Sequence, residues 1–135
     1  MLLIFLFSCK NADQKKVYDD QNSGFKTVTV AEAYKLLNAN PDGYVLLDVR
    51  TPEEIREGKL AGAMELDFQN EKFSSDLDAL NTANTYMVYC RSGGRSSSAA
   101  EMMVSKGFKN VINVDGGYTG WVEYVNSGAN PPLQR

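Results

Sequence analysis

The chain has 135 residues and a formal net charge of −3, with 43% hydrophobic residues, 23% charged residues and no histidine. This length is typical of one domain, and the composition is that of a globular protein. The negative charge argues against a nucleic-acid-binding protein, because such proteins bind the phosphate backbone through clustered lysines and arginines. Without histidine the chain can form neither a Cys–His catalytic pair nor a histidine-containing zinc site.

Residues 1–7 are all apolar, and a serine and then Cys9 follow them. This run is too short to cross a bilayer, which takes about 20 residues, and it lacks the basic start of a complete secretory signal. Residues 6–9 resemble the processing box of bacterial lipoproteins, in which the cysteine carries lipid and becomes the first residue of the mature chain. We therefore expect a shortened leader at 1–8, a lipid on Cys9 that anchors the protein to the periplasmic side of a bacterial membrane, and a polar tether at 9–24. The alternative is a cytoplasmic chain with a chance apolar start.

From residue 25 onward, helical and strand-like segments alternate along the chain. Helices are indicated by N-caps and by apolar residues three or four positions apart, and strands by short apolar runs. The expected elements are a helix from Thr29 to about 38–43, a strand at 44–49, a helix at 52–57, a strand at 63–66, a helix at 74–80, a strand at 85–89, a helix from about Ser96, a strand at 111–114 and a helix at 118–125. This alternation predicts an α/β domain whose central, mostly parallel sheet carries helices on both faces.

The residue with the most distinctive chemistry is Cys90, which directly follows the strand expected at 85–89. A glycine-rich turn comes next and consists of Arg91, Ser92, Gly93, Gly94, Arg95 and Ser96. Its glycines can adopt positive φ at little steric cost, so that consecutive backbone N–H groups point into one concavity beside the thiol. The N-terminus of the next helix and the two arginines add positive charge. We therefore expect the pKa of the Cys90 thiol to lie below the free value of roughly 8.5, which favours the thiolate at neutral pH.

Other cysteine-based or glycine-based sites do not fit the sequence. Cys90 has no second cysteine at the spacing of a dithiol motif, and Cys9 is the one other cysteine of the chain. The turn also lacks the lysine and the spacing of a nucleotide-binding loop. What remains is single-thiolate chemistry on a small anion or on sulfur, with no metal and no organic cofactor. Open α/β sheets bind ligands at the carboxyl ends of their strands, which agrees with the position of Cys90.

Three segments of the chain resemble the single-domain rhodaneses, a family of sulfurtransferases. Residues 90–95 are similar to the family's active-site loop, 45–67 to its strand, Asp-Val-Arg motif and acidic helix, and 107–121 to its closing strand, glycine pair and tryptophan. We interpret Gly116, Gly117 and Trp121 as packing residues, because a glycine pair between a strand and a helix indicates special backbone angles. Lys59 and Ala61 stand where the family usually has histidine and proline, in a turn outside the loop. The resemblance implies a rhodanese-like α/β fold for residues 25–135.

The resemblance also implies a sulfurtransferase that takes sulfane sulfur from a donor such as thiosulfate, carries it as a persulfide on Cys90 and passes it to a small thiol or to a thiol or redox protein. Residues 91–96 would bind the substrate, and Asp48 beside Arg50 would have a supporting role. Two alternatives are open. One is a non-catalytic or sulfur-carrier module that binds a partner. The other is a phosphatase or arsenate reductase, whose loop in the related families is one residue longer and has arginine where this chain has Ser96.

Overall fold

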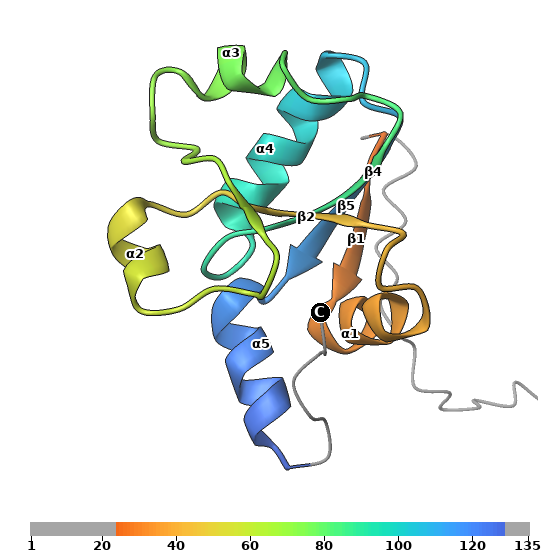
Figure 1. Cartoon of the computed structure of the whole chain (residues 1–135), viewed down its shortest axis with the longest axis vertical. Coiled ribbons are helices and arrows are strands. Elements are labelled where there is room, and N and C mark those ends of the chain that lie inside the picture. Colours follow the sequence, from red (N-terminus) through yellow and green to blue (C-terminus); the bar gives the residue numbers. More distant parts are fainter. Residues whose placement is uncertain (1–23, 129–135) are drawn as a thin grey trace, which may run out of the picture.

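Residues 24–128, which the computed structural model describes, form a five-stranded parallel sheet with helices on both faces (Figure 1). The elements in chain order are β1 (Lys26–Thr29), α1 (Val30–Ala39), β2 (Val45–Asp48), α2 (Pro52–Arg56), β3 (Met64–Glu65), α3 (Phe73–Leu77), β4 (Thr85–Tyr89), α4 (Gly94–Ser105), β5 (Asn110–Asp115) and α5 (Gly117–Asn126). The expected leader, Cys9 and all but the last residue of the expected tether lie outside the described residues. Within residues 24–128, no helix is both long and apolar enough to span a bilayer.

The strand order in the sheet is β1-β5-β4-β2-β3, and every neighbouring pair is parallel. β4 is therefore the central strand, with β5 on one side and β2 on the other. The carboxyl ends of these three strands lie side by side, because Asp48 pairs with Tyr89 and Val88 pairs with Asn113. The loops that follow β2, β4 and β5 consequently meet at one edge of the sheet.

Two hydrophobic cores lie on opposite faces of the sheet, because successive side chains of a strand point to opposite sides. Val88 and Cys90 belong to the core that includes Met103 of α4 and also residues of α3. Met87 belongs to the other core, together with Trp121 of α5 and residues of α1. The sheet is thus covered by α3 and α4 on one face and by α1 and α5 on the other, which confirms the predicted fold class.

Two helices begin at capping boxes, one at Thr29, where the sequence predicts a capping box, and one at Thr51, where it predicts an N-cap. At the start of α1 the Thr29 hydroxyl oxygen accepts a hydrogen bond from the Glu32 amide at 3.2 Å, and the Glu32 carboxylate accepts one from the Thr29 amide at 3.1 Å. Thr51 and Glu54 form the same reciprocal pair at the start of α2. These bonds satisfy amides that would otherwise have no partner in the first helical turn.

Some element boundaries differ from the prediction. The strand β1 was not predicted, because its four residues are mostly polar and only Val28 is buried. The helix α3 covers 73–77 rather than 74–80, and β3 has two residues rather than four. The helix α4 begins at Gly94, two positions before the predicted start near Ser96, so part of the glycine turn is already helical.

Candidate active site

Cys90 lies at the carboxyl end of the central strand β4, and its side chain is buried at the start of the loop that leads to α4. The residue is 1% exposed. Although the residue belongs to a hydrophobic core, its sulfur lies within hydrogen-bond distance of polar groups of the loop. The backbone amide of Gly93 donates a hydrogen bond to Sγ at 3.1 Å, and the hydroxyl of Ser96 lies 3.4 Å from the same atom. The loop therefore folds back over the thiol, as the sequence predicts.

The surroundings of the thiol favour its ionised form. Burial alone would raise the pKa of Cys90, because it removes water from the thiolate. Hydrogen bonds from the Ser96 hydroxyl and from the backbone amides of Ser96, Gly93 and Ser92 act in the opposite direction and outweigh burial. The pKa of the Cys90 thiol is consequently below its ordinary value, and the main-chain donors of the loop are part of the cause.

The N-terminus of α5 turns the loop so that its amides face the sulfur. The amide of Tyr118 donates to the carbonyl of Cys90 at 2.8 Å, the amide of Thr119 to that of Arg91 at 3.1 Å, and the amide of Gly116 to that of Ser92 at 3.1 Å. These bonds hold three consecutive carbonyl groups against α5. In a trans peptide unit the N–H points away from the C=O, so these carbonyl contacts leave the amides of Ser92 and Gly93 free to donate to Cys90.

The glycine pair at the start of α5, Gly116 as its N-cap and Gly117 as its first residue, is required by this close contact. A Cβ on Gly117 would lie 2.7 Å from the carbonyl carbon and oxygen of Arg91. Gly116 and Gly117 also have φ of 91° and 53°, a region that side-chain-bearing residues rarely adopt. The pair therefore packs against the loop, and the prediction of a packing role for it is correct. Its importance is greater than predicted, because it positions the loop around the thiol.

The two glycines of the loop itself have different roles. Gly93 has a φ of 122°, and a Cβ there would lie 3.1 Å from Oδ1 of Asp115. Gly94 is the first residue of α4 and does not have positive φ, and a Cβ there would meet open space. Only Gly93 thus supplies the left-handed turn that the sequence analysis expected from both glycines.

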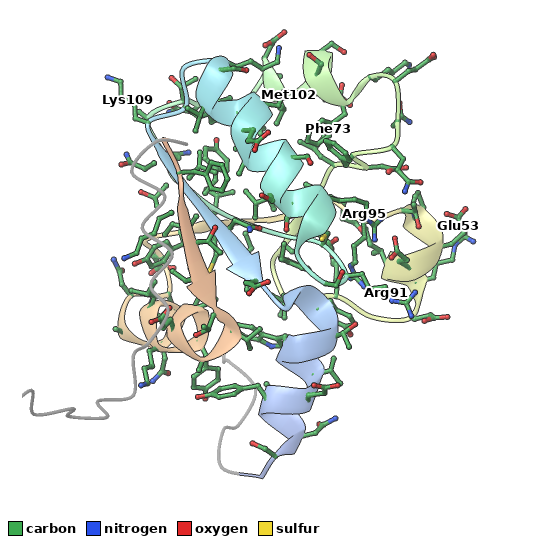
Figure 2. All side chains as sticks on the ribbon, turned by 180° about the vertical axis from the view of Figure 1, so that it is seen from behind. Glu53, Phe73, Arg91, Arg95, Met102 and Lys109 are labelled. Carbon is green, nitrogen blue, oxygen red and sulfur yellow. The ribbon has the colours of Figure 1, made fainter. Side chains whose placement is uncertain are left out.

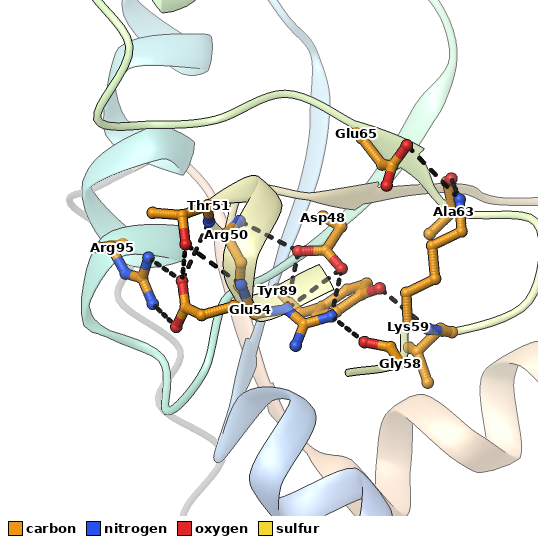
Figure 3. Close-up of polar contacts among 11 residues, drawn as sticks. Asp48, Arg50, Thr51, Glu54, Gly58, Lys59, Ala63, Glu65, Tyr89 and Arg95 are labelled. Atoms are coloured by element: carbon orange, nitrogen blue, oxygen red, sulfur yellow. Dashed lines mark hydrogen bonds and ion pairs between the residues drawn. The ribbon is translucent and has the colours of Figure 1, made fainter. Parts of the chain in front are cut away.

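Arg95 forms a bidentate ion pair with Glu54 of α2 (Figure 3). Its Nη1 and Nη2 lie 2.8 and 2.6 Å from the two carboxylate oxygens, and both side chains are 22% exposed. The hydrogen bonds from Arg95 are the main cause that lowers the pKa of Glu54 to about 2. Glu54 also accepts hydrogen bonds from Thr51. Arg95 therefore ties the loop and α4 to the N-terminus of α2.

Arg91 occupies a different place from Arg95. It is exposed and, together with Glu57, Tyr118 and Val122, lines a cavity of about 380 Å³ between α2 and α5. Figure 2 shows both arginines on the side of the molecule where α2 lies. The sequence predicts a substrate-binding role for both arginines, whereas the structure places them in different surroundings. Arg95 is held by a carboxylate, and Arg91 faces solvent at the neighbouring cavity.

Asp48 and Arg50 form a buried ion pair at the end of β2 (Figure 3). Nη2 of Arg50 lies 2.7 Å from Oδ2 of Asp48 and also donates to the carbonyl of Gly58 at 2.8 Å. The guanidinium carbon lies 4.1 Å from the ring centroid of Tyr118, the residue whose amide holds the Cys90 carbonyl. The pair thus connects β2, the loop after α2 and the start of α5, which is the arrangement that a supporting role requires.

Asn113 of β5 is a polar residue of the site that the sequence analysis missed. It is 4% exposed, and its Oδ1 lies 2.6 Å from the hydroxyl oxygen of Ser96. Asn113 shares the sheet face of Val111, which belongs to the core that contains Cys90. A polar side chain at a core-facing position of an apolar strand was the available signal. Glu54 lies in the first turn of α2, where an acidic residue is common, and its pairing with Arg95 depends on tertiary structure. Residues 24–128 contain no group of three or more side chains suited to hold a metal ion.

Comparison with known proteins gives consistent results. Residues 29–124 match the family described as "Rhodanese-like domain". Thiosulfate sulfurtransferase 18 of Arabidopsis thaliana is 34% identical over 110 residues, which cover 73% of this chain and 79% of that protein. Thiosulfate sulfurtransferase GlpE of Stutzerimonas stutzeri is 32% identical over 97 residues, with coverage of 72% and 84%. The crystal structure of a rhodanese-related protein from Thermoplasma volcanium is similar with a TM-score of 0.64 at 27% identity, and the match covers 81% of this chain and 98% of that one.

Proposed function

The chain belongs to the family of rhodanese-like domains, and on that premise we propose that it is a sulfurtransferase that carries sulfane sulfur as a persulfide on Cys90. The observation that carries the proposal is the set of donors around the sulfur, with the Gly93 amide at 3.1 Å and the Ser96 hydroxyl at 3.4 Å. Relatives named thiosulfate sulfurtransferases, at 32% to 34% identity, support the same class of activity.

The proposed reaction has two steps and begins from the thiolate. Sγ of Cys90 attacks the outer sulfur of a donor such as thiosulfate, the donor's S–S bond breaks, and its electron pair leaves with sulfite. The product is a persulfide whose outer sulfur carries negative charge. An acceptor thiolate, or cyanide in an assay, then attacks that outer sulfur, and the electron pair of the breaking bond returns to Sγ. Donors already aimed at the sulfur stabilise charge at the place where it develops.

The two arginines have separate roles in this proposal. Arg95 braces the loop through Glu54, since its guanidinium is held at both nitrogens by that carboxylate. Arg91 is an exposed residue of the loop itself, and its charge attracts an anionic donor. Ser92 and Gly93 contribute backbone amides, whereas the lack of a side chain at Gly94 is not required, because a Cβ there would meet open space.

Persulfide formation is tested by mass spectrometry of the intact protein. The purified protein is mixed with thiosulfate, and we expect a gain of one sulfur atom that cyanide removes. Cys90→Ser should abolish the gain, whereas Cys9→Ser, which changes the other cysteine of the chain, should retain it. A folded wild-type protein that never gains this mass would refute the proposal.

Turnover measurements distinguish the alternative functions. A stable persulfide with slow transfer to cyanide and to small thiols would indicate a sulfur-carrier module that serves a protein acceptor. Hydrolysis of an aryl phosphate without any reaction with thiosulfate would indicate a phosphatase. A sulfur substrate is favoured over a phosphate ester because the loop has four residues between Cys90 and Arg95, one fewer than in the loop of the related phosphatases.

We also propose that Cys9 carries a lipid and that the polar residues after it act as a tether on the periplasmic side of a membrane. The support is the order of residues 6–9 and the polar composition of the segment that follows. Mass spectrometry of the protein isolated from the membrane fraction of its native host should find a lipid-modified Cys9. An unmodified Cys9 in protein recovered from the soluble fraction would contradict the proposal.

A further inference from the structure

The hydroxyl of Ser96 lies among three acceptors but carries a single proton. Its oxygen is 3.4 Å from Sγ of Cys90, 3.1 Å from the carbonyl oxygen of Gly93 and 2.6 Å from Oδ1 of Asn113. A hydroxyl donates one hydrogen bond at a time. The shortest of the three contacts is the one to Asn113. Donation of the Ser96 proton to the sulfur therefore competes with donation to Oδ1 of Asn113 and to the Gly93 carbonyl.

The position of Asn113 is unusual for an amide side chain. The residue is 4% exposed, and it is paired with Val88 on the central strand, two residues before Cys90. A buried amide costs stability unless its polar atoms are hydrogen-bonded, so an apolar residue would fit this face of β5 more simply. The hydrogen bond of its Oδ1 goes to Ser96, a side chain that contacts the nucleophile.

We propose that Asn113 is a positioning residue whose amide directs the Ser96 hydroxyl toward the sulfur of Cys90 when that sulfur is charged. While Cys90 is a thiol, its S–H can donate to the Ser96 oxygen, and the Ser96 O–H donates to Oδ1 of Asn113. When the thiol proton leaves to solvent, the sulfur can only accept. The Ser96 O–H then turns to the sulfur, and the amide rotates so that Nδ2–H donates to the Ser96 oxygen.

Ser96 keeps its proton in both states, and only the direction of the hydrogen bonds changes. An amide suits this exchange because it has a donor and an acceptor on one neutral group, whereas a carboxylate can only accept and an alkyl group can do neither. The inference deepens the proposed function, since the charged sulfur is the nucleophile in that reaction. It can nevertheless be tested separately, because ionisation of the thiol is measurable without sulfur transfer.

The test is the pKa of Cys90 in single and double variants of the full chain. The rate of alkylation by iodoacetamide is measured across pH and read by mass spectrometry on the peptide that contains Cys90, so that Cys9 does not contribute. We expect Ser96→Ala and Asn113→Ala each to raise the pKa by about one unit, which is a tenfold loss of thiolate. The pKa of Cys90 in the double variant should be no higher than in Ser96→Ala alone. Ser98→Ala, an exposed serine of the same helix, should leave the pKa unchanged.

Two results would overturn the inference. One is a double variant whose pKa shift equals the sum of the two single shifts, because the residues would then act independently. The other is a folded Asn113→Ala protein with the wild-type pKa. Failure of the wild-type protein to form a persulfide, with the expected pKa shifts intact, would refute the proposed function and leave the role of Asn113 standing.

A second substitution covers the case in which Asn113→Ala does not fold. Asn113→Asp keeps the shape of the side chain but can only accept, and it adds a negative charge near the sulfur. We expect it to raise the pKa of Cys90, and to raise it less when Ser96 is also replaced by alanine. An equal shift in both backgrounds would mean that the added charge acts alone, and this too would overturn the inference.

Discussion

Replacing Glu54 with glutamine removes the charge that ties α2 to the loop, and we expect this change to destabilise the protein at neutral pH. The hydrogen bonds from Arg95 are the main cause that lowers the pKa of Glu54 from its ordinary value of 4.5 to about 2. A drop of that size corresponds to about 3 kcal/mol of stability. Because both side chains are 22% exposed, solvent screening reduces this amount. We therefore expect Glu54→Gln to cost about 1–2 kcal/mol.

The cost should depend on pH in a defined direction. The folded pKa of Glu54 lies below the unfolded one, so the stabilisation is complete above the ordinary value of 4.5 and is lost as the pH falls toward 2. Urea unfolding of the wild type and of Glu54→Gln, at neutral pH and at a series of acidic pH values, measures the difference in free energy of unfolding. Glu53→Gln, at an exposed neighbouring position of α2, is the control. An equal loss in Glu53→Gln, or a difference that stays constant from neutral pH down to pH 2, would refute the reasoning.

Three further substitutions, together with Gly94→Ala as a control for the first, test how the loop is held. Gly93→Ala forces a side chain into a φ of 122°, and we expect at least a tenfold slower gain of sulfur from thiosulfate, whereas Gly94→Ala, with open space around its Cβ, should stay near the wild-type rate. Gly117→Ala places a Cβ 2.7 Å from the Arg91 carbonyl, and we expect urea unfolding to show a loss of about 2 kcal/mol together with slower persulfide formation. Arg50→Lys removes the forked contact with the buried carboxylate of Asp48, and we expect urea unfolding to show a free energy of unfolding lower by about 2 kcal/mol or more. Unchanged stability would contradict the supporting role of this pair.

Most of the fold could be predicted from local patterns in the sequence. Thr29 and Thr51 mark helix starts, because each has a glutamate three positions later and the reciprocal hydrogen bonds form within the segment itself. The strand at 85–89 is covered on both faces, so nearly all of its residues are buried. Such a strand is a short apolar run in the sequence, which is why it could be predicted. The strand β1 could not be predicted in this way, since it lies at the edge of the sheet and buries only Val28, and its register depends on pairing with β5.

The site was predictable where it is contiguous in sequence and not where it depends on tertiary contacts. The loop from Cys90 to Ser96 shows its glycines and donors directly. Its orientation depends on hydrogen bonds from the start of α5, and the glycine pair there indicates only close packing. The partner of Arg95 lies 41 positions earlier in the chain, so sequence spacing carries no information about it. Asn113 likewise reaches Ser96 only because β5 lies beside β4.

The central claim is that main-chain and hydroxyl donors of the loop hold an ionised sulfur on Cys90. Its most direct test is a titration of the wild-type thiol, in which the rate of alkylation of the Cys90 peptide is followed across pH. We expect the midpoint to lie below the free-cysteine value of roughly 8.5, because hydrogen bonds from Ser96, Gly93 and Ser92 outweigh the burial that opposes ionisation. A midpoint at or above that value in the folded protein would contradict the claim.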